Sequence, residues 1–261
     1  MRRELTNQIN YQWRVTKYNP DFRDENGYYT LTEEWTCPSE IGKIISGEKF
    51  TLEEYLQVET AYVDTVINFI EGSGINSLRI LQLSNWNISE EDKKSPLYET
   101  EFDEMKLKED MMVSINEIRL ICKMALRNFL NCQLYLKDNF FVHFSWDYYM
   151  YIGSYVDCLS SMEHAKNNGL FAERIQSPYF FSEEETIRLI QWNEIDDEII
   201  VGDQELTEIS LDEYRRIFNL STEHPVIGSF EIKQEQMEFF QKHLNHQMDF
   251  NKYEYQFWGG Y

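Results

Sequence analysis

Two histidines near the C-terminal end of the chain have a spacing that could hold a metal ion. His243 and His246 are three residues apart, and a helix over 233–246 would place both imidazoles on one face, with Asp249 one turn further along. With carboxylates from elsewhere, such a pair could serve a metal-dependent hydrolase. However, no H-E-x-x-H pattern and no cysteine ligand accompanies them. We keep the hydrolase as an alternative and expect no metal and no other cofactor.

The other residues that could do catalysis form no recognisable motif. The sequence contains no G-x-S-x-G, and the turn Gly72-Ser73-Gly74 lacks the further glycine and the lysine of a phosphate-binding loop. His143 could act as a base, but we favour a hydrogen-bonded histidine within a strand. No pair of cysteines has CxxC spacing, and all four lie among apolar neighbours, which indicates small core residues: Cys37, Cys122, Cys132 and Cys158. These observations favour a protein that is not an enzyme.

The formal net charge of −22 is the most unusual property of the sequence. It far exceeds the roughly 2 to 8 charges that keep a small domain soluble. Because negative charge repels phosphate groups, we expect no direct binding to nucleic acid or to an anionic membrane, and we expect a basic protein partner instead. The alternative is that these acids do no more than face water.

The acidic residues are concentrated in the C-terminal part of the chain. Residues 1–50 hold eight acids and seven bases, whereas residues 179–212 hold eleven acids and the single base Arg188. A negative surface there would accelerate encounter with a basic partner. The carboxylates that we expect to contact this partner are Glu194, Asp196, Asp197 and Glu198.

Aromatic residues would supply the apolar part of a binding surface. We expect Trp192, next to the acidic residues, to act as a buried anchor. The aromatic run 140–153 adds Trp146, Tyr148 and Tyr151 as candidates at a strand turn. Core packing is the alternative for this run, because alternation in a strand sends half of its side chains inward.

The N-terminus suggests no export signal. Arg2 and Arg3 are not followed by an apolar segment, and no apolar run in the chain reaches the roughly 18 residues of a membrane span. We therefore expect a cytoplasmic protein.

The elements that position these residues follow from hydrophobic periodicity and capping signals. Two capping boxes, Thr51 with Glu54 and Ser114 with Glu117, predict helices that begin there, and Gly72 ends the first. Residues 87–110 are charged and poor in apolar residues, which predicts an excursion outside the core. We predict strands over 9–17, 77–83, 132–136, 140–145, 148–152 and 170–175, with Gly153 ending the fifth and a further helix over 155–167.

A domain boundary is expected near Pro178, which gives domains over 1–178 and 179–261. In the second, capping boxes at Ser182 with Glu185 and at Ser210 with Glu213 bracket a hairpin over 195–209 that turns at Gly202-Asp203. The helix over 233–246 and an aromatic strand near 253–257 follow. We predict an α+β fold with a mixed, largely antiparallel sheet packed with helices, plus a smaller acidic C-terminal α+β lobe.

Three segments resemble uncharacterised acidic bacterial proteins. They are the run from Phe140 to Gly153, Gly169-Leu170-Phe171-Ala172-Glu173, and Ser177-Pro178-Tyr179. The resemblance covers roughly residues 1–178 and implies no known activity. It implies only that the final 83 residues are a lobe added to a shorter unit.

These features lead to the hypothesis of a non-enzymatic inhibitor or immunity-type protein that binds and neutralises a basic partner. A nuclease toxin is the leading candidate, blocked at its nucleic-acid surface. One alternative is a nucleic-acid mimic that inhibits a defence enzyme, with carboxylates in place of phosphates. The metal-dependent hydrolase, and a structural or sensor subunit whose acidic lobe docks to a larger assembly, are the others. The sequence does not specify an oligomeric state.

Overall fold

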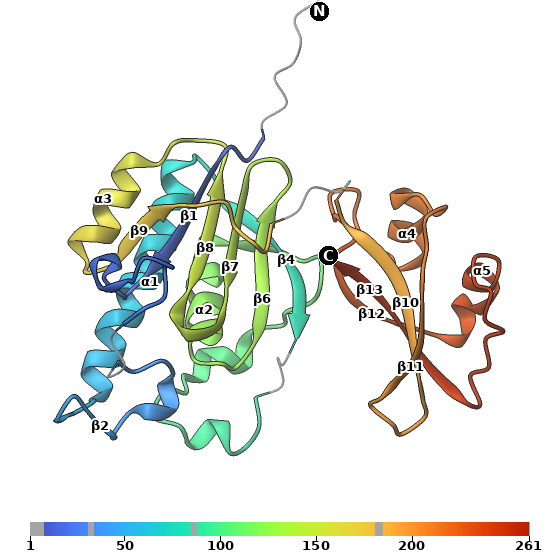
Figure 1. The fold of residues 1–261 in the computed structure, drawn as a ribbon, viewed down its shortest axis with the longest axis horizontal. Helices are drawn as coiled ribbons and strands as arrows, with labels where there is room; N and C mark the ends of the chain where they lie inside the picture. The colour runs from blue at the N-terminus through green and yellow to red at the C-terminus, as the bar shows by residue number, and fades with distance from the viewer. Residues whose placement is uncertain (1–7, 31–33, 85–87, 181–184, 261) are drawn as a thin grey trace, which may run out of the picture. The chain divides into compact units, whose positions relative to one another are not determined.

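The computed structural model describes residues 8–30, 34–84, 88–180 and 185–260. The chain divides into two compact units, Met1–Tyr179 and Phe180–Tyr261, each with a hydrophobic core of its own (Figure 1). The α+β prediction is confirmed. In the described part of the chain every pairing between strands is antiparallel.

The first unit is built on a seven-stranded sheet in the order β5-β4-β6-β7-β8-β1-β9. Its strands are β1 Tyr11–Thr16, β4 Ser77–Ser84, β5 Met112–Ser114, β6 Asn131–Leu136, β7 Phe140–Phe144, β8 Met150–Ser154 and β9 Phe171–Arg174. Its helices are α1 Leu52–Gly72, α2 Ile115–Leu126 and α3 Leu159–Asn167, and β2 Ile44–Ile45 pairs with β3 Glu48–Lys49 in a separate ribbon. No helix among the described residues is long and apolar enough to cross a bilayer.

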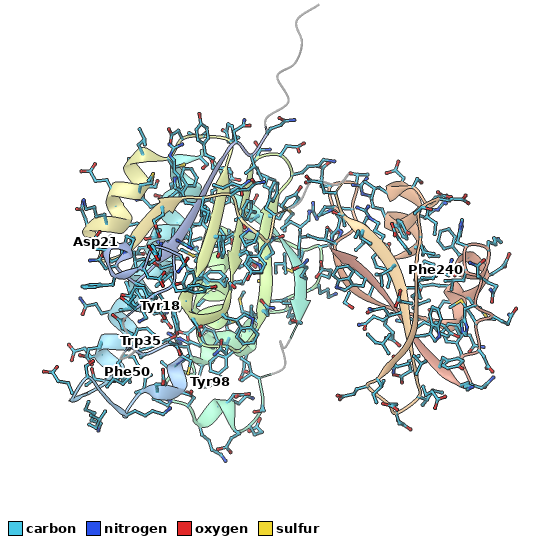
Figure 2. All side chains as sticks on the ribbon, in the orientation of Figure 1. Tyr18, Asp21, Trp35, Phe50, Tyr98 and Phe240 are labelled. Carbon is cyan, nitrogen blue, oxygen red and sulfur yellow. The ribbon has the colours of Figure 1, made fainter. Side chains whose placement is uncertain are left out.

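Side-chain alternation decides which face of this sheet is buried. In β1, Trp13 and Val15 are fully buried, whereas Arg14 points to the opposite face and is half-buried. The predicted capping box of α1 is confirmed: the Thr51 backbone N–H donates to Glu54 Oε2 at 2.7 Å, and the Glu54 N–H donates to Thr51 Oγ1 at 3.2 Å. In the segment before α1, the Trp35 ring stacks on Phe50 at a centroid distance of 4.6 Å (Figure 2). Aromatic residues thus supply much of the core, as their number in the sequence indicates.

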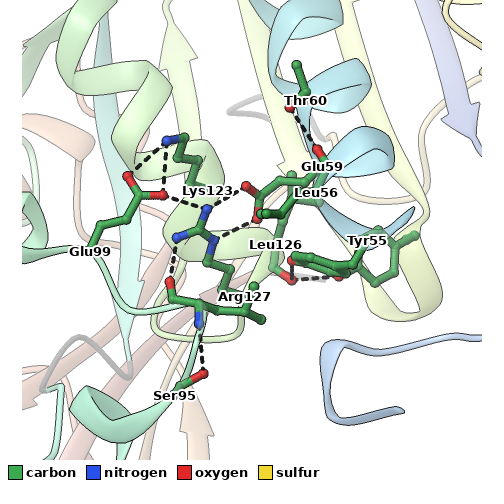
Figure 3. A network of polar contacts seen from close by, with 11 residues as sticks. Tyr55, Leu56, Glu59, Thr60, Ser95, Glu99, Lys123, Leu126 and Arg127 are labelled. Carbon is green, nitrogen blue, oxygen red and sulfur yellow. Dashed lines mark hydrogen bonds and ion pairs between the residues drawn. The ribbon is translucent and has the colours of Figure 1, made fainter. Parts of the chain in front are cut away.

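Three side chains of residues 88–110 lie in the core, so the prediction that 87–110 is an excursion outside the core was wrong in that respect; residue 87 lies outside the described residues. Leu97, Phe102 and Leu107 are 6%, 1% and 4% exposed. The segment is fixed by the buried Arg127, which donates to the Leu97 carbonyl oxygen (Figure 3). Three well-spaced apolar side chains therefore suffice to anchor to the core a segment whose average composition is polar.

Arg127 is the centre of a buried polar network. Its Nε and Nη2 donate to the two oxygens of Glu59, at 2.7 and 2.6 Å, and both side chains are 2% exposed. Glu99 lies 2.6 Å from Arg127 Nη2, and Lys123 donates to Glu99 at 2.9 Å (Figure 3). The network joins α1, α2 and the segment before α2, and sequence reasoning did not predict it.

The turn between β7 and β8 is strained. Asp147 and Tyr148 have φ of 55° and 60°, the left-handed region that a two-residue hairpin turn requires but that suits Asn-Gly far better. Tertiary contacts hold Tyr148 in place: its hydroxyl donates to the Leu126 carbonyl oxygen at 2.9 Å, and Tyr62 Oη donates to the Tyr148 carbonyl oxygen at 2.6 Å. The turn displaces the predicted strand by two residues, so Gly153 lies inside β8. A side chain at Gly153 would collide with the Phe141 ring, which explains the glycine.

The second unit contains a four-stranded sheet in the order β11-β10-β13-β12. Its elements are β10 Ile187–Glu194, β11 Ile200–Glu205, α4 Leu211–Ile217, β12 Gly228–Ile232, α5 Met237–Gln241 and β13 Tyr253–Gly260. Tyr214 of α4 and Phe240 of α5 are fully buried with Phe257 of β13, and both helices lie on one face of the sheet (Figures 1 and 2). The capping box of Ser210 and Glu213 is confirmed, whereas Ser182 lies outside the described residues.

Two predicted elements of this unit were misplaced. The hairpin turns at 195–199 rather than at Gly202-Asp203, because Gly202 lies within β11 and packs against the Trp192 indole, where a Cβ would collide with the ring. The last helix, predicted over 233–246, ends at Gln241, whose side chain forms hydrogen bonds with the backbone of the following loop. Its amide nitrogen donates to the His246 carbonyl oxygen at 3.0 Å, and its Oε1 accepts from the Met248 N–H at 2.8 Å.

Candidate functional site

The acidic residues predicted to contact a partner lie together at the tip of the β10–β11 hairpin. Glu194 ends β10, and Asp196, Asp197 and Glu198 lie in the turn; all four are exposed. The Asp197 carboxylate accepts from the Ile199 N–H at 2.9 Å, and Asn193 Nδ2 donates to the Asp197 carbonyl oxygen at 2.6 Å. These bonds fix the backbone of the turn, so the carboxylates project from a defined structure.

Apolar side chains are exposed between these acids. Ile195, Ile199, Ile200 and Val201 are 42%, 67%, 51% and 51% exposed. Such a group of β-branched residues at one tip is a surface that binding would bury, and the sequence reasoning overlooked it. The signal was present in the sequence as Ile-Ile-Val directly after the acidic residues. We call residues 194–201 the hairpin tip.

The charge of the hairpin tip is poorly compensated within the described residues. Glu194 reaches Lys252 at 4.0 Å, and neither Asp196 nor Glu198 forms an ion pair there. The second unit as a whole carries 18 Asp and Glu against six Lys and Arg, a net charge of −12. A cationic partner would therefore find several carboxylates not already engaged.

Trp192, the predicted anchor, is instead committed to packing beneath the hairpin tip. Its ring stacks on His246 at 4.3 Å with an interplanar angle of 13°. His246 Nε2 in turn lies 2.9 Å from the Tyr255 hydroxyl, and burial followed by the charge of Lys252 lowers the pKa of His246. Trp192 is half-buried and stiffens the base of the hairpin rather than offering a free ring.

The histidines proposed as metal ligands are not brought together. Because α5 ends at Gln241, His243 and His246 do not share a helix face. His246 is engaged by Tyr255, and Asp249 caps the next turn by accepting from the Asn251 N–H at 3.0 Å. Within the described ranges no three or more His, Cys, Asp or Glu residues are grouped so that they could hold a metal ion.

The aromatic candidates of the first unit have opposite environments. Trp146 is 86% exposed at the strained β7–β8 turn, whereas Tyr148 is 7% exposed and hydrogen-bonded in the core. Tyr148 therefore cannot contact a partner, and Tyr151, at 8%, is buried as well. In a strand, Trp146 and Tyr148 would share one face because they are two residues apart. They do not share one here, because both lie in the turn between β7 and β8.

Among the candidate catalytic groups of the first unit, Cys122, Cys132 and Cys158 are buried, whereas His143 and Cys37 are half-buried. His143 stacks on Tyr179 at 4.2 Å, and burial lowers its pKa to about 4. Burial raises the pKa of the Cys132 thiol to about 12 and that of Cys122 further. Buried, protonated thiols at Cys122 and Cys132 are suited to packing, as predicted for them. Cys37 was also predicted in the core but is half-buried, and among the described residues His143 has a stacking contact rather than the predicted hydrogen bond.

A family model described as "Domain of unknown function (DUF7683)" matches residues 187–258. The match is consistent with partial resemblance to an uncharacterised family, and it covers β10 to β13, whereas the resemblance in the sequence was placed on residues 1–178. No curated protein and no solved structure shows significant similarity to the chain.

Proposed function

We propose that this chain is a non-enzymatic, acidic protein that binds a basic protein partner through the hairpin tip and neutralises it. The observation that supports this most directly is the combination at one tip of four exposed carboxylates with four exposed β-branched side chains. A solvated charged surface needs no apolar side chains in its middle. A protein–protein interface needs both apolar and charged side chains, since apolar contact supplies affinity and charge supplies a fast association rate and selectivity.

The charge distribution defines the class of partner. A unit of net charge −12 attracts cationic surfaces and repels phosphates. The surface of a nuclease that holds its nucleic-acid substrate is cationic, so a nuclease toxin is the partner that we propose. An immunity-type protein should bind one such enzyme tightly, whereas a nucleic-acid mimic should inhibit several unrelated DNA-binding enzymes.

The first experiment is affinity capture of the tagged full chain from native lysate at low and high salt, followed by binding kinetics with the purified partner. The variant Asp196→Asn, Asp197→Asn, Glu198→Gln removes three charges from the hairpin tip, and the amide oxygen introduced at position 197 keeps an acceptor for the Ile199 N–H. The matched control is Glu231→Gln, Glu235→Gln, Glu238→Gln, which removes three exposed charges elsewhere in the same unit.

We expect the tip variant to lower the association rate by about tenfold or more at low salt, and the control by no more than about threefold, since only charges near the contact steer encounter strongly. The wild-type rate should fall steeply as salt rises, because the Debye length shrinks from about 30 Å at 0.01 M to about 8 Å at 0.15 M. Equal effects of the two variants, or an association rate insensitive to salt, would refute the proposal.

A further inference from the structure

Two arginines of the first unit share a single carboxylate. Arg14 lies in β1 directly opposite Glu173 of β9, and Arg23 follows the short 3-10 helix Pro20–Phe22. Arg14 Nη2 lies 3.2 Å from one oxygen of Glu173, and Arg23 Nη1 lies 2.7 Å from the other. The pair therefore keeps one positive charge in excess, in a chain whose net charge is −22.

Several donors of this cluster have no acceptor. Arg14 Nε, Arg23 Nε, Arg23 Nη2 and the Tyr18 hydroxyl are buried without a hydrogen-bond partner. The Arg23 side chain is 10% exposed, and Tyr18 is 4% exposed. Buried donors are nearly always paired, so three unpaired N–H groups on two arginines that share one carboxylate indicate that an acceptor is missing. The unpaired Tyr18 hydroxyl is linked to them through Tyr149, whose ring lies 5.7 Å from both the Tyr18 ring and the Arg14 guanidinium.

The surroundings of the cluster are aromatic on one side and charged on the other. The Tyr18 ring lies 5.1 Å from Tyr29 and 5.7 Å from Tyr149, and the Arg14 guanidinium lies 5.7 Å from the Tyr149 ring centroid. Lys17 Nζ lies 4.1 Å above the Tyr18 ring and is paired with Glu34 at 2.8 Å.

Access to the cluster is from the edge where Arg14 and Glu173 meet. Their side chains are 19% and 28% exposed, more than that of Arg23. Burial and, after it, the exposed carboxylate of Asp147 in the β7–β8 turn raise the pKa of Tyr18. An anion must therefore bind close to two carboxylates besides Glu173, namely Asp147 and Glu34, of which Glu34 is paired with Lys17. Binding then requires strong, directed donors rather than net positive charge alone.

We propose that Arg14, Arg23 and Tyr18 form a binding site for a tetrahedral oxyanion, a phosphate or phosphate monoester. The anion displaces Glu173 from one guanidinium and accepts hydrogen bonds from the N–H groups that now lack a partner. Guanidinium groups are suited to this because their donors lie in a planar fork that matches phosphate oxygens. The unpaired N–H donors lie on two separate guanidinium groups, which suits a tetrahedral anion better than a planar carboxylate. The site is independent of the hairpin tip.

The test is titration of the full chain with inorganic phosphate by calorimetry. We expect saturable binding at one site, at least tenfold weaker in Arg23→Gln and weaker in Tyr18→Phe, which removes only the hydroxyl. Glu173→Gln should bind more tightly, because it removes the competing carboxylate. The matched control Arg119→Gln removes an arginine whose ion pair with Asp64 is 43% exposed on both sides, and it should bind like wild type.

Thermal melting of each variant separates loss of binding from loss of folding, and the tighter binding expected of Glu173→Gln cannot arise from unfolding. Absence of saturable binding up to about 10 mM phosphate in both wild type and Glu173→Gln would overturn the proposal. So would equal effects of Arg23→Gln and Arg119→Gln, or malonate binding as tightly as phosphate. Comparison of phosphoserine with inorganic phosphate identifies the source: tighter phosphoserine binding indicates a phosphate monoester, and tighter phosphate binding indicates the free ion.

Discussion

Replacing Arg127 with methionine should destabilise the first unit strongly. The substitution keeps an unbranched apolar stem but leaves Glu59, whose side chain is 2% exposed, without the two hydrogen bonds of 2.7 and 2.6 Å that now neutralise it. Removing one partner of a buried ion pair costs about 3–5 kcal/mol. The Leu97 carbonyl oxygen and Glu99 lose a donor as well, so we expect a loss near the upper end of that range.

The assay is equilibrium unfolding in urea, followed by tryptophan fluorescence. With a slope of about 1–3 kcal/mol per molar urea, a loss of about 5 kcal/mol lowers the midpoint of the first unit by roughly 1.7–5 M. Arg119→Met is the matched control, because its pair with Asp64 is exposed and should contribute less than about 1 kcal/mol.

A second substitution tests the cause. Adding Glu59→Leu to Arg127→Met removes the stranded carboxylate, and it should restore at least half of the lost stability, since apolar replacements of a buried pair are often neutral. A loss below about 1 kcal/mol for Arg127→Met, or no recovery in the double variant, would show that this reasoning about the network is wrong.

Two further predictions concern the β7–β8 region. Burial lowers the pKa of His143 to about 4, so between pH 6.5 and 4 the unfolded chain binds a proton that the folded chain does not bind. As pH falls through this window, the free energy of unfolding of wild type should decrease by up to about 1.4 kcal/mol per pH unit more than that of His143→Gln, measured by urea unfolding at each pH. Parallel stability curves for the two proteins would contradict the pKa shift. Tyr148→Phe removes a hydroxyl that donates to the Leu126 carbonyl oxygen and lies 3.2 Å from Tyr55 Oη. It should lower the free energy of unfolding, measured by thermal melting, by about 1–3 kcal/mol. Trp146→Ala is the control: its side chain is 86% exposed, so it should change stability by less than about 0.5 kcal/mol.

Elements whose signals are local could be predicted from the sequence. The capping boxes at Thr51, Ser114 and Ser210 set the starts of α1, α2 and α4, because the cap and its acidic partner are three residues apart in any context. Two glycines, by contrast, led to wrong predictions of where strands turn or end. Gly202 and Gly153 suggested turns or strand ends, yet each lies inside a strand beneath an aromatic ring from a neighbouring strand.

Features that depend on tertiary contacts could not be predicted. Glu59 and Arg127 are 68 residues apart, and nothing in the sequence near either indicates that they pair. The average polarity of segment 88–110 predicts an excursion, whereas three apolar side chains spaced along it lie in the core. For the candidate site, the acidic residues 194–198 were found from composition alone, whereas burial of Tyr148 depends on a turn that only the folded structure reveals.

The place of β1 in its sheet has a consequence for synthesis of the chain. Trp13 pairs in register with Ile152 of β8 on one side and with Arg174 of β9 on the other. At roughly 5–20 residues per second, about 160 further residues take roughly 8–30 seconds to emerge from the ribosome. For most of that interval, until β8 emerges, the nascent N-terminal segment exposes Trp13 and two unpaired backbone edges, and the edge that pairs with β9 stays unpaired to the end. Translation speed and chaperone capture in that interval should therefore influence the yield of folded protein more than the final stability of the sheet does.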